Sequence, residues 1–213
     1  MQLFKILCHD LRGPVSSLIQ LQQVAGLVDK KTNDKLKKKA IHKTEKLLYF
    51  MEDLLLWGKG QMVNFTTQSE TICIDSLFKY AEKHFSDDEE ITFSFHNPEK
   101  LMLFTDHDFV KTILRNLTAN ALAFTKNLPN PLITFKAWSD EYSVYISVFN
   151  NGEAKNFNRF NTLYHENDYV NSRSGLGLHL IRDLAQIIDC KLSTNFTEEG
   201  TTIKLTFEKQ QLN

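Results

Sequence analysis

The first 60 positions of the chain carry apolar residues at a helical spacing. Between residues 7 and 28 these residues recur at alternating steps of four and three, as in the seam of a packed helix: Leu7, Leu11, Pro14, Leu18, Leu21, Ala25 and Val28. A polar stretch at 29–34 interrupts the pattern and supplies helix-capping residues. The spacing then resumes in two seven-residue series, with Thr44 and Met51 between them: Ala40, Leu47 and Leu54, and Ile41, Leu48 and Leu55. The pattern predicts a helical hairpin with an apolar stripe on each arm.

Two helices alone cannot shield such stripes from water. The simplest solution is a homodimer through residues 1–60 that closes a four-helix bundle. Gly58 and Gly60 loosen the end of the second helix, and the following stretch at 64–70 is polar. We therefore expect a helical hairpin domain at 1–63 and a second domain at 64–213.

Beyond this linker, short β-rich runs alternate with amphipathic helices. Strands are expected at 71–74, 91–95, 101–104, 132–138, 142–149, 191–195 and 201–207. Helices are expected at 75–85, 106–124 and 176–188, the first two opened by an aspartate in a good N-cap position. The interleaving predicts an α/β sandwich with helices layered on a mixed sheet, so that the whole chain is α+β.

Composition excludes several classes of partner and site. The 213 residues hold 25 Lys+Arg against 26 Asp+Glu, which gives no basic field for binding nucleic acid. No apolar run approaches the roughly 18 residues of a membrane span, so we expect no membrane contact by this chain. Cys8, Cys73 and Cys190 are odd in number and far apart, which argues against a disulfide framework and a structural zinc site. A reducing cytoplasm is the expected location.

His9 is the first candidate for chemistry. On the first helix it points roughly 150° away from the apolar stripe and so faces solvent. A lone surface histidine usually has no role, but Asp10 follows it directly. An imidazole with an ordinary pKa of about 6.5 is largely neutral at cytoplasmic pH and can act as a nucleophile. The neighbouring carboxylate can orient the ring and accept its proton, which makes Asp10 the orienting base.

Three further groups in the second half are candidates for chemistry, and each also has a simple structural interpretation. Asn116 and Asn120 lie four apart on one helix face, which is either a solvated side or a pair of amide oxygens suited to Mg²⁺ and a triphosphate. The stretch 150–152 after a strand, Asn-Asn-Gly, is turn chemistry in its simplest interpretation. Gly175 and Gly177 open a helix, where backbone N–H groups can hold phosphate, although Gly-Leu pairs also begin ordinary helices.

Taken in order, these motifs resemble the core of two-component sensor histidine kinases, from about residue 1 to 207. His9-Asp10-Leu11-Arg12-Gly13-Pro14 resembles the family's phosphoacceptor motif H-[DE]-L-R-x-P, and 53–61 looks like the end of its second helix. Asn116-Leu117-Thr118-Ala119-Asn120-Ala121 resembles the asparagine box. The stretches 148–154 and 174–178 resemble the two glycine boxes, and Gly200-Thr201-Thr202 completes the set.

The resemblance implies a dimerisation and phosphotransfer hairpin followed by an ATP-binding domain. The γ-phosphoryl group of Mg-ATP would pass to His9 and then to an aspartate of a response-regulator receiver domain. By the same resemblance Asn120 is a magnesium ligand and Asn116 serves magnesium and phosphate. Asn150 and Thr201 lie near the adenine. The glycines Gly152, Gly175 and Gly177 complete the nucleotide site.

The sequence departs from the family's pattern at four positions. Asn150 stands where the family has an aspartate that accepts a hydrogen bond from the adenine amino group. Ala154 and Arg173 replace glycines of the two glycine boxes, and Ala123 replaces a common phosphate-contacting lysine. These departures favour an alternative, a catalytically weak or dead dimeric scaffold that signals through partner binding.

A third interpretation is an ATPase of the same nucleotide fold, as in chaperones and topoisomerases. It is disfavoured because those proteins lack a histidine-bearing hairpin, and because the nucleotide half has no obvious carboxylate to activate water. Only eight residues precede His9, too few for a sensor domain. We therefore expect the chain to be the cytoplasmic part of a longer receptor.

Overall fold

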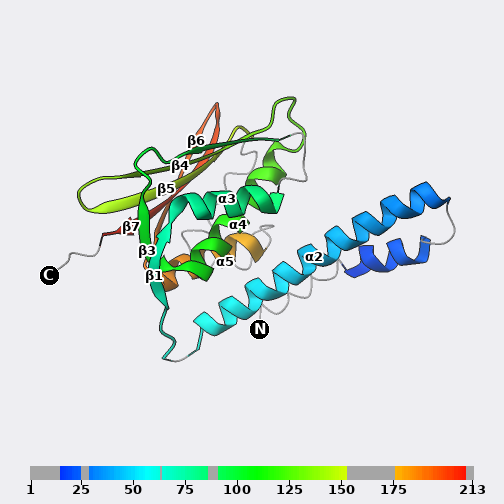
Figure 1. The fold of residues 1–213 in the computed structure, drawn as a ribbon, viewed down its shortest axis with the longest axis horizontal. Coiled ribbons are helices and arrows are strands. Elements are labelled where there is room, and N and C mark those ends of the chain that lie inside the picture. Colours follow the sequence, from blue (N-terminus) through cyan, green and yellow to red (C-terminus); the bar gives the residue numbers. More distant parts are fainter. Residues whose placement is uncertain (1–14, 25–28, 63, 86–90, 153–175, 210–213) are drawn as a thin grey trace. The chain divides into compact units, whose positions relative to one another are not determined.

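A computed structural model describes residues 15–24, 29–62, 64–85, 91–152 and 176–209 (Figure 1). The chain forms two compact units, residues 1–59 and 60–213, a division that falls a few residues before the expected boundary. His9, Asp10 and Gly175 lie outside the described residues, as does the stretch 153–175.

The first unit is helical throughout its described part. Residues 15–24 form one helix, and the 31-residue helix α2 runs over Lys30–Gly60. The carboxylate of Asp29 accepts hydrogen bonds from the backbone N–H and the hydroxyl of Thr32, and so caps the start of α2. Four apolar side chains on α2 are 50–73% exposed in the single chain: Ile41, Leu48, Met51 and Leu55. The helices are present as expected, whereas the dimeric four-helix bundle stays a prediction.

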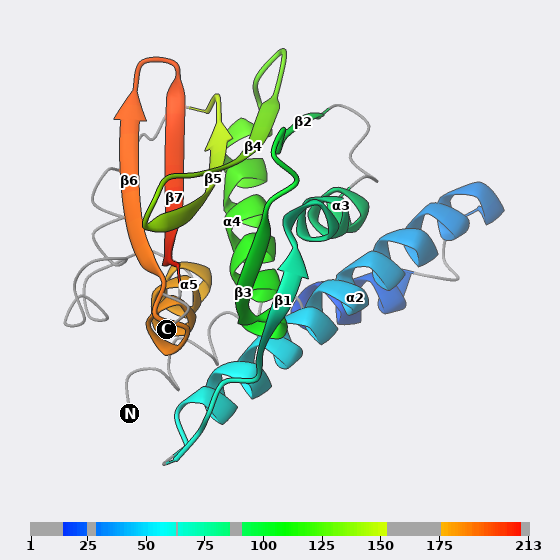
Figure 2. The ribbon, with the colours of Figure 1, turned by 60° about the vertical axis from the view of Figure 1, so that its left-hand side comes forward.

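The second unit contains a five-stranded mixed sheet in the order β2-β4-β5-β7-β6 (Figure 2). Its strands are β2 (Thr92–His96), β4 (Leu132–Ser139), β5 (Ser143–Asn150), β6 (Lys191–Thr197) and β7 (Gly200–Glu208). Strands β2 and β4 are parallel, and the other neighbours are antiparallel. The expected mixed sheet is therefore confirmed.

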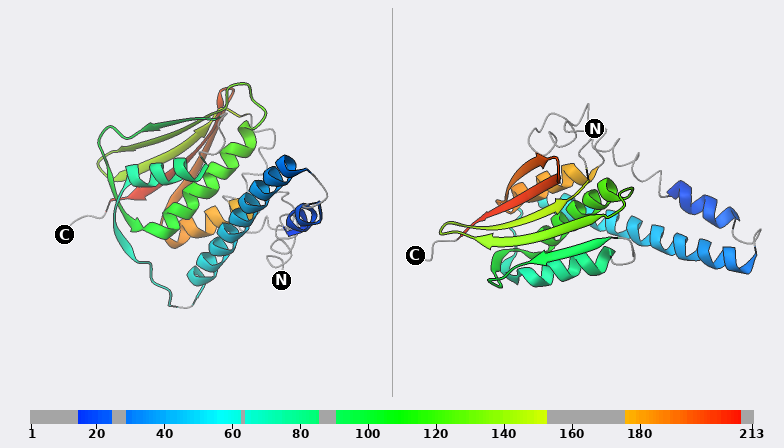
Figure 3. Two further views of the ribbon diagram at one scale, coloured as in Figure 1. Left: turned by 45° about the vertical axis from the view of Figure 1, so that its right-hand side comes forward. Right: turned by 90° about the horizontal axis from the view of Figure 1, so that it is seen from above.

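Three helices cover one face of this sheet: α3 (Ile74–Phe85), α4 (His107–Thr125) and α5 (Leu176–Ile187) (Figure 3). Helix α4 packs against α3, α5, β4 and β5, and so lies at the centre of the layer. The core forms where alternate strand residues meet the apolar faces of the helices. Its largest fully buried side chains are Phe78, Phe109, Phe135, Ile74, Leu77, Ile113, Leu114, Leu117, Ile133, Ile146, Ile181 and Leu184.

Two details differ from expectation. The strands β1 (Ser69–Cys73) and β3 (Met102–Asp106) pair with each other in a separate antiparallel sheet, a partition that the sequence did not indicate. Asp75 is not a helix cap, because β1 runs straight into α3 at Ile74 and leaves no position for one. Asp75 lies in the first turn instead and accepts a hydrogen bond of 2.9 Å from the side chain of Asn97.

No helix within the described residues is long and apolar enough to cross a bilayer.

The two described cysteines are free and differ in exposure, which leads to a testable difference in reactivity. Cys190 is buried, and this burial raises the pKa of its thiol to about 12, whereas Cys73 is half-buried. At pH 8 Cys190 therefore holds on the order of a thousandfold less thiolate than a thiol of ordinary pKa near 8.5. We expect maleimide to modify Cys73 well before Cys190 in the folded chain, as measured by peptide mass spectrometry over time. Equal rates in buffer would contradict this, and equal rates in denaturant serve as the control.

Candidate functional site

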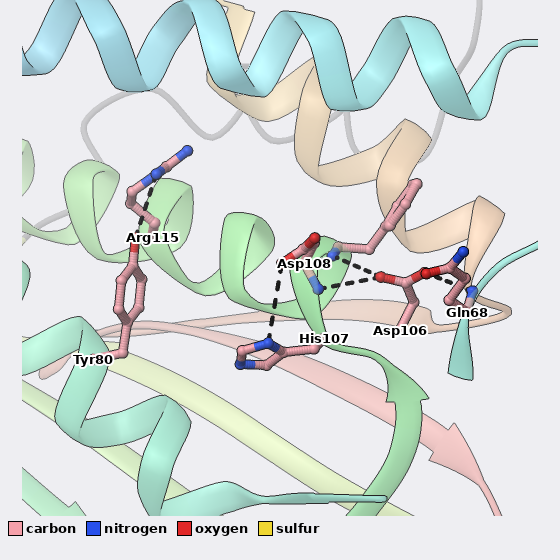
Figure 4. A network of polar contacts seen from close by, with 7 residues as sticks. Gln68, Tyr80, Asp106, His107, Asp108 and Arg115 are labelled. Atoms are coloured by element: carbon pink, nitrogen blue, oxygen red, sulfur yellow. Dashed lines mark hydrogen bonds and ion pairs between the residues drawn. The ribbon is translucent and has the colours of Figure 1, made fainter. Parts of the chain in front are cut away.

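The start of α4 is fixed by the carboxylate of Asp106 (Figure 4). One oxygen accepts from the backbone N–H groups of Asp108 and Phe109, at 3.1 and 3.4 Å, which confirms the expected N-cap. The other oxygen accepts from the backbone N–H of Gln68 at 2.8 Å. One carboxylate thus joins the segment before β1 to the helix that carries both candidate asparagines.

The flank of α4 that faces α3 is held by polar and aromatic contacts. Arg115 Nη1 donates to the hydroxyl of Tyr80 at 3.4 Å, as Figure 4 shows. The ammonium group of Lys111 lies 4.2 Å from the centroid of the Tyr80 ring. These contacts fix the rotation of α4, and with it the direction of its remaining polar side chains.

Asn116 and Asn120 of α4 meet the first turn of α5 at Gly177. Asn116 Nδ2 donates to the carbonyl oxygen of Thr112 at 3.0 Å. A Cβ atom added to Gly177 would lie 3.2 Å from Asn116 Oδ1 and 4.0 Å from each amide atom of Asn120. Glycine thus allows the backbone of α5 to approach both amides closely, at the end of the helix where the dipole is positive.

Asn120 also lines a small pocket between α4 and the sheet. Its other polar lining residue is Asn150 at the end of β5, which is 5% exposed. The remaining lining is apolar: Leu117, Ala121, Phe124, Val148 and Ile203. Asn120 Nδ2 is buried and has no hydrogen-bond partner among the described residues. A buried donor without an acceptor lowers the stability of the fold. It therefore marks a position where a bound ligand could supply the missing acceptor.

Two glycines bring the backbone close around Asn150. A Cβ atom on Gly152 would lie 2.5 Å from the carbonyl oxygen of Phe124, so only glycine lets the end of β5 pack on the end of α4. Gly200 has a φ of +148°, and a Cβ atom there would overlap the carbonyl oxygen of Asn150. Thr201, 1% exposed, pairs with Asn150 across β5 and β7.

The structure therefore gathers most of the described candidates at one site. Asn116, Asn120 and Gly177 converge, and Asn120 and Asn150 share the pocket. Thr201 lies next to Asn150 in the sheet, although Ile203 lines the pocket in its place. Gly152 has a packing contact with α4 and donates its N–H to Asn150 Oδ1 at 3.1 Å. The apolar lining was missed, because its residues have the spacing of ordinary core positions and give no separate signal.

The donor set fits a magnesium ion only together with phosphate oxygens. No group of three or more His, Cys, Asp or Glu side chains in the described part of the chain could hold a metal ion. The amide oxygens of Asn116 and Asn120 are hard, neutral ligands. Mg²⁺ commonly combines one or two protein oxygens with the phosphates of a substrate and with water.

Replacement of Gly177 by alanine separates binding from stability. The added methyl group would press on Asn116 Oδ1 at 3.2 Å and occupy space in front of both amides. Alanine is also the better helix former by about 1 kcal/mol. We therefore expect Gly177→Ala to keep or slightly raise the melting temperature, while it weakens nucleotide binding about tenfold or more. Parallel thermal unfolding and calorimetric titration check this, and unchanged affinity would remove Gly177 from the site.

Known proteins resemble this chain in sequence over part of its second unit and in fold over most of its length. Residues 105–211 match the sequence model described as histidine kinase-, DNA gyrase B- and HSP90-like ATPase. No curated protein matches the sequence significantly. Among solved structures, the Acinetobacter baumannii histidine kinase AdeS has a TM-score of 0.70 at 15% identity, over 95% of this chain and 98% of the solved AdeS chain.

Structures of the histidine kinase ThkA are similar as well. Its catalytic domain has a TM-score of 0.59 at 22% identity, over 67% of this chain and 98% of that domain. ThkA in complex with the response regulator TrrA has a TM-score of 0.65 at 18% identity, over 98% of this chain and 61% of the solved ThkA chain. At these identities the likeness concerns the fold.

Proposed function

The chain belongs to the histidine kinase-, DNA gyrase B- and HSP90-like ATPase family, and from that premise we propose that it is the core of a sensor histidine kinase. Its second domain binds Mg-ATP. The γ-phosphoryl group passes to His9 of the first domain and then to an aspartate of a response-regulator receiver domain. The single observation that carries this proposal is the position of Asn120, which lines the pocket and also faces Gly177.

A nucleotide spans these two places. Its base enters the pocket beside Asn150, among apolar side chains that suit a flat aromatic ring, and Thr201 lies next to Asn150 in the sheet. Its phosphates lie at the start of α5, where the first turn at Gly177 offers backbone N–H groups and the positive end of the helix dipole. Magnesium, when bound, neutralises phosphate charge. The Asn120 amide oxygen would hold this ion, and Asn116 would assist with magnesium and phosphate.

Phosphoryl transfer then depends on positioning and charge neutralisation. An imidazole nitrogen of His9 attacks the γ-phosphorus, the bond to the β–γ bridging oxygen breaks, and ADP leaves. Asp10 orients the ring and accepts the proton that the imidazole loses. No carboxylate is among the described residues that line the pocket, and the proposed product is therefore a phosphorylated side chain and not inorganic phosphate.

Two partners belong to the proposal. The first is a second copy of the chain, supported by the exposed apolar stripe of α2. The second is a response-regulator receiver domain, supported by the fold shared with ThkA, which was solved in complex with TrrA.

The dimer leads to a prediction by truncation. The full chain should sediment as a dimer, because each hairpin exposes Ile41, Leu48 and Leu55 to water. A chain beginning near Glu70 lacks these helices, so it should sediment as a folded monomer that still binds nucleotide. Sedimentation velocity and circular dichroism check both chains. A truncated chain that remained dimeric would show that the interface lies outside the hairpin.

Incubation with γ-labelled Mg-ATP at several millimolar tests the proposed function. We expect acid-labile, base-stable label, because phosphohistidine has that stability and phosphoserine does not. Acid-stable label would overturn the proposal. Nucleotide binding without any label would favour the second candidate, a signalling scaffold without activity, which the departure at Asn150 supports.

A further inference from the structure

Asn150 offers the pocket a hydrogen-bond donor where an aspartate would offer an acceptor. We propose that the pocket takes 6-oxo purine nucleotides, such as GTP and ITP, at least as tightly as ATP, and that Asn150 determines this selectivity. The inference rests on the proposed function, because it assumes that the pocket holds the base of a nucleotide.

The placement of Asn150 directs its side chain into the pocket. It is the last residue of β5 and lies on the same face of the sheet as Val148, two positions earlier, because strand residues alternate between faces. Val148 lines the pocket together with Ile203 of the neighbouring strand β7. The side chain of Asn150 therefore faces α4, and at 5% exposure it is shielded from bulk water.

The amide orientation of Asn150 is set by Gly152. Gly152 N donates to Asn150 Oδ1 at 3.1 Å, and this is the only hydrogen bond of the Asn150 side chain within the described residues. An asparagine has one acceptor and one donor group, so the reverse orientation would bring Nδ2 against the Gly152 N–H, two donors face to face. With its oxygen engaged, Asn150 presents Nδ2 to a ligand.

Among the described residues, the rest of the lining leaves no acceptor for the base. Five of the seven lining residues are apolar, and the oxygen of the other polar one, Asn120, is the proposed magnesium ligand. A purine with an amino group at position 6 places a donor against Asn150, whereas a 6-oxo group places an acceptor there. ATP can gain the bond only if the amide turns, which leaves the buried Gly152 N–H without its acceptor.

Titration of the full chain with Mg-ATP, Mg-GTP and Mg-ITP tests the inference. We expect ITP and GTP to bind at least as tightly as ATP. In Asn150→Asp one carboxylate oxygen keeps the Gly152 bond and the other accepts from the 6-amino group. The ratio of ATP affinity to ITP affinity should therefore rise about tenfold or more. The variant gains a hydrogen bond to the 6-amino group of ATP and loses the donor to the 6-oxo group of ITP.

Asn151→Asp is the matched control, because it adds the same charge one residue away. Its side chain accepts from Leu132 N at 2.9 Å and donates to Asn130 O at 2.8 Å, contacts that lie outside the pocket lining. This variant should keep the base preference of the wild type. Thermal unfolding without nucleotide shows whether each variant folds. If Asn150→Asp does not fold, the order of the three nucleotide affinities in the wild type decides whether the inference holds.

The outcomes separate the two proposals. A wild type that binds ATP about tenfold more tightly than ITP overturns the inference and leaves the proposed function standing. Tight GTP with weak ITP also overturns it, since the 2-amino group would then carry the selectivity. The inference is also overturned if Asn150→Asp folds but keeps the wild-type ratio of ATP affinity to ITP affinity. If none of the three nucleotides binds at millimolar concentration, the proposed function itself fails.

Discussion

Replacement of His9 by glutamine is expected to abolish phosphorylation of the chain from Mg-ATP. Glutamine keeps a polar side chain of similar reach, but its amide nitrogen is not a nucleophile, because its lone pair is delocalised into the carbonyl group. Loss of the attacking imidazole removes the covalent step completely, so the labelled fraction should fall below detection, by about a thousandfold or more.

The same variant should bind nucleotide as the wild type does, since the pocket and the Gly177 face lie in residues 116–203. His42→Gln is the matched control: His42 is an exposed histidine of α2, and its replacement should leave the label intact. Gel autoradiography after acid and alkali treatment, with calorimetry for binding, measures all three chains. Label that persisted in His9→Gln would assign the phosphoacceptor to another residue.

Local patterns predicted the elements of the second unit well. The seven strands and three helices in the described part of this unit lie within two residues of their expected ends. The alternation in strands such as β4 and β5 was clear because one face of each is buried under the helices, with Phe135 and Ile146 fully enclosed. Turn and cap residues fixed the ends, as Asp106 does for α4.

Pairings between distant segments could not be predicted in the same way. Strands β1 and β3 are ordinary half-exposed strands by composition, and only their partners set them apart from the main sheet. The same holds for the site. Asn120 and Asn150 were found by their motifs, but the sequence gave no sign that Gly152 engages the oxygen of Asn150, because that bond depends on the local path of the backbone.

Replacement of Asn120 by alanine should raise the stability of the fold and lower the phosphorylation activity. Its Nδ2 atom is buried and lacks a hydrogen-bond partner in the described part of the chain, which costs about 1–3 kcal/mol of folding free energy. Alanine removes this atom and is also a better helix former. Against these gains stands a small loss of packing, so we expect Asn120→Ala to raise the free energy of unfolding by about 1 kcal/mol.

Activity should fall by about a hundredfold or more in the same variant. The Asn120 oxygen is the proposed magnesium ligand, and loss of one such electrostatic contact in a transition state typically costs about 3–4 kcal/mol. Asn130→Ala is the control, because it makes the same chemical change at an exposed residue outside the pocket lining and should alter neither quantity. Urea unfolding gives the stability, and the initial rate of His9 labelling gives the activity. A destabilised Asn120→Ala that remained active would mean that Asn120 is a structural amide of the core. A stabilised and inactive one means that the chain keeps a costly buried donor because its nucleotide site requires that side chain.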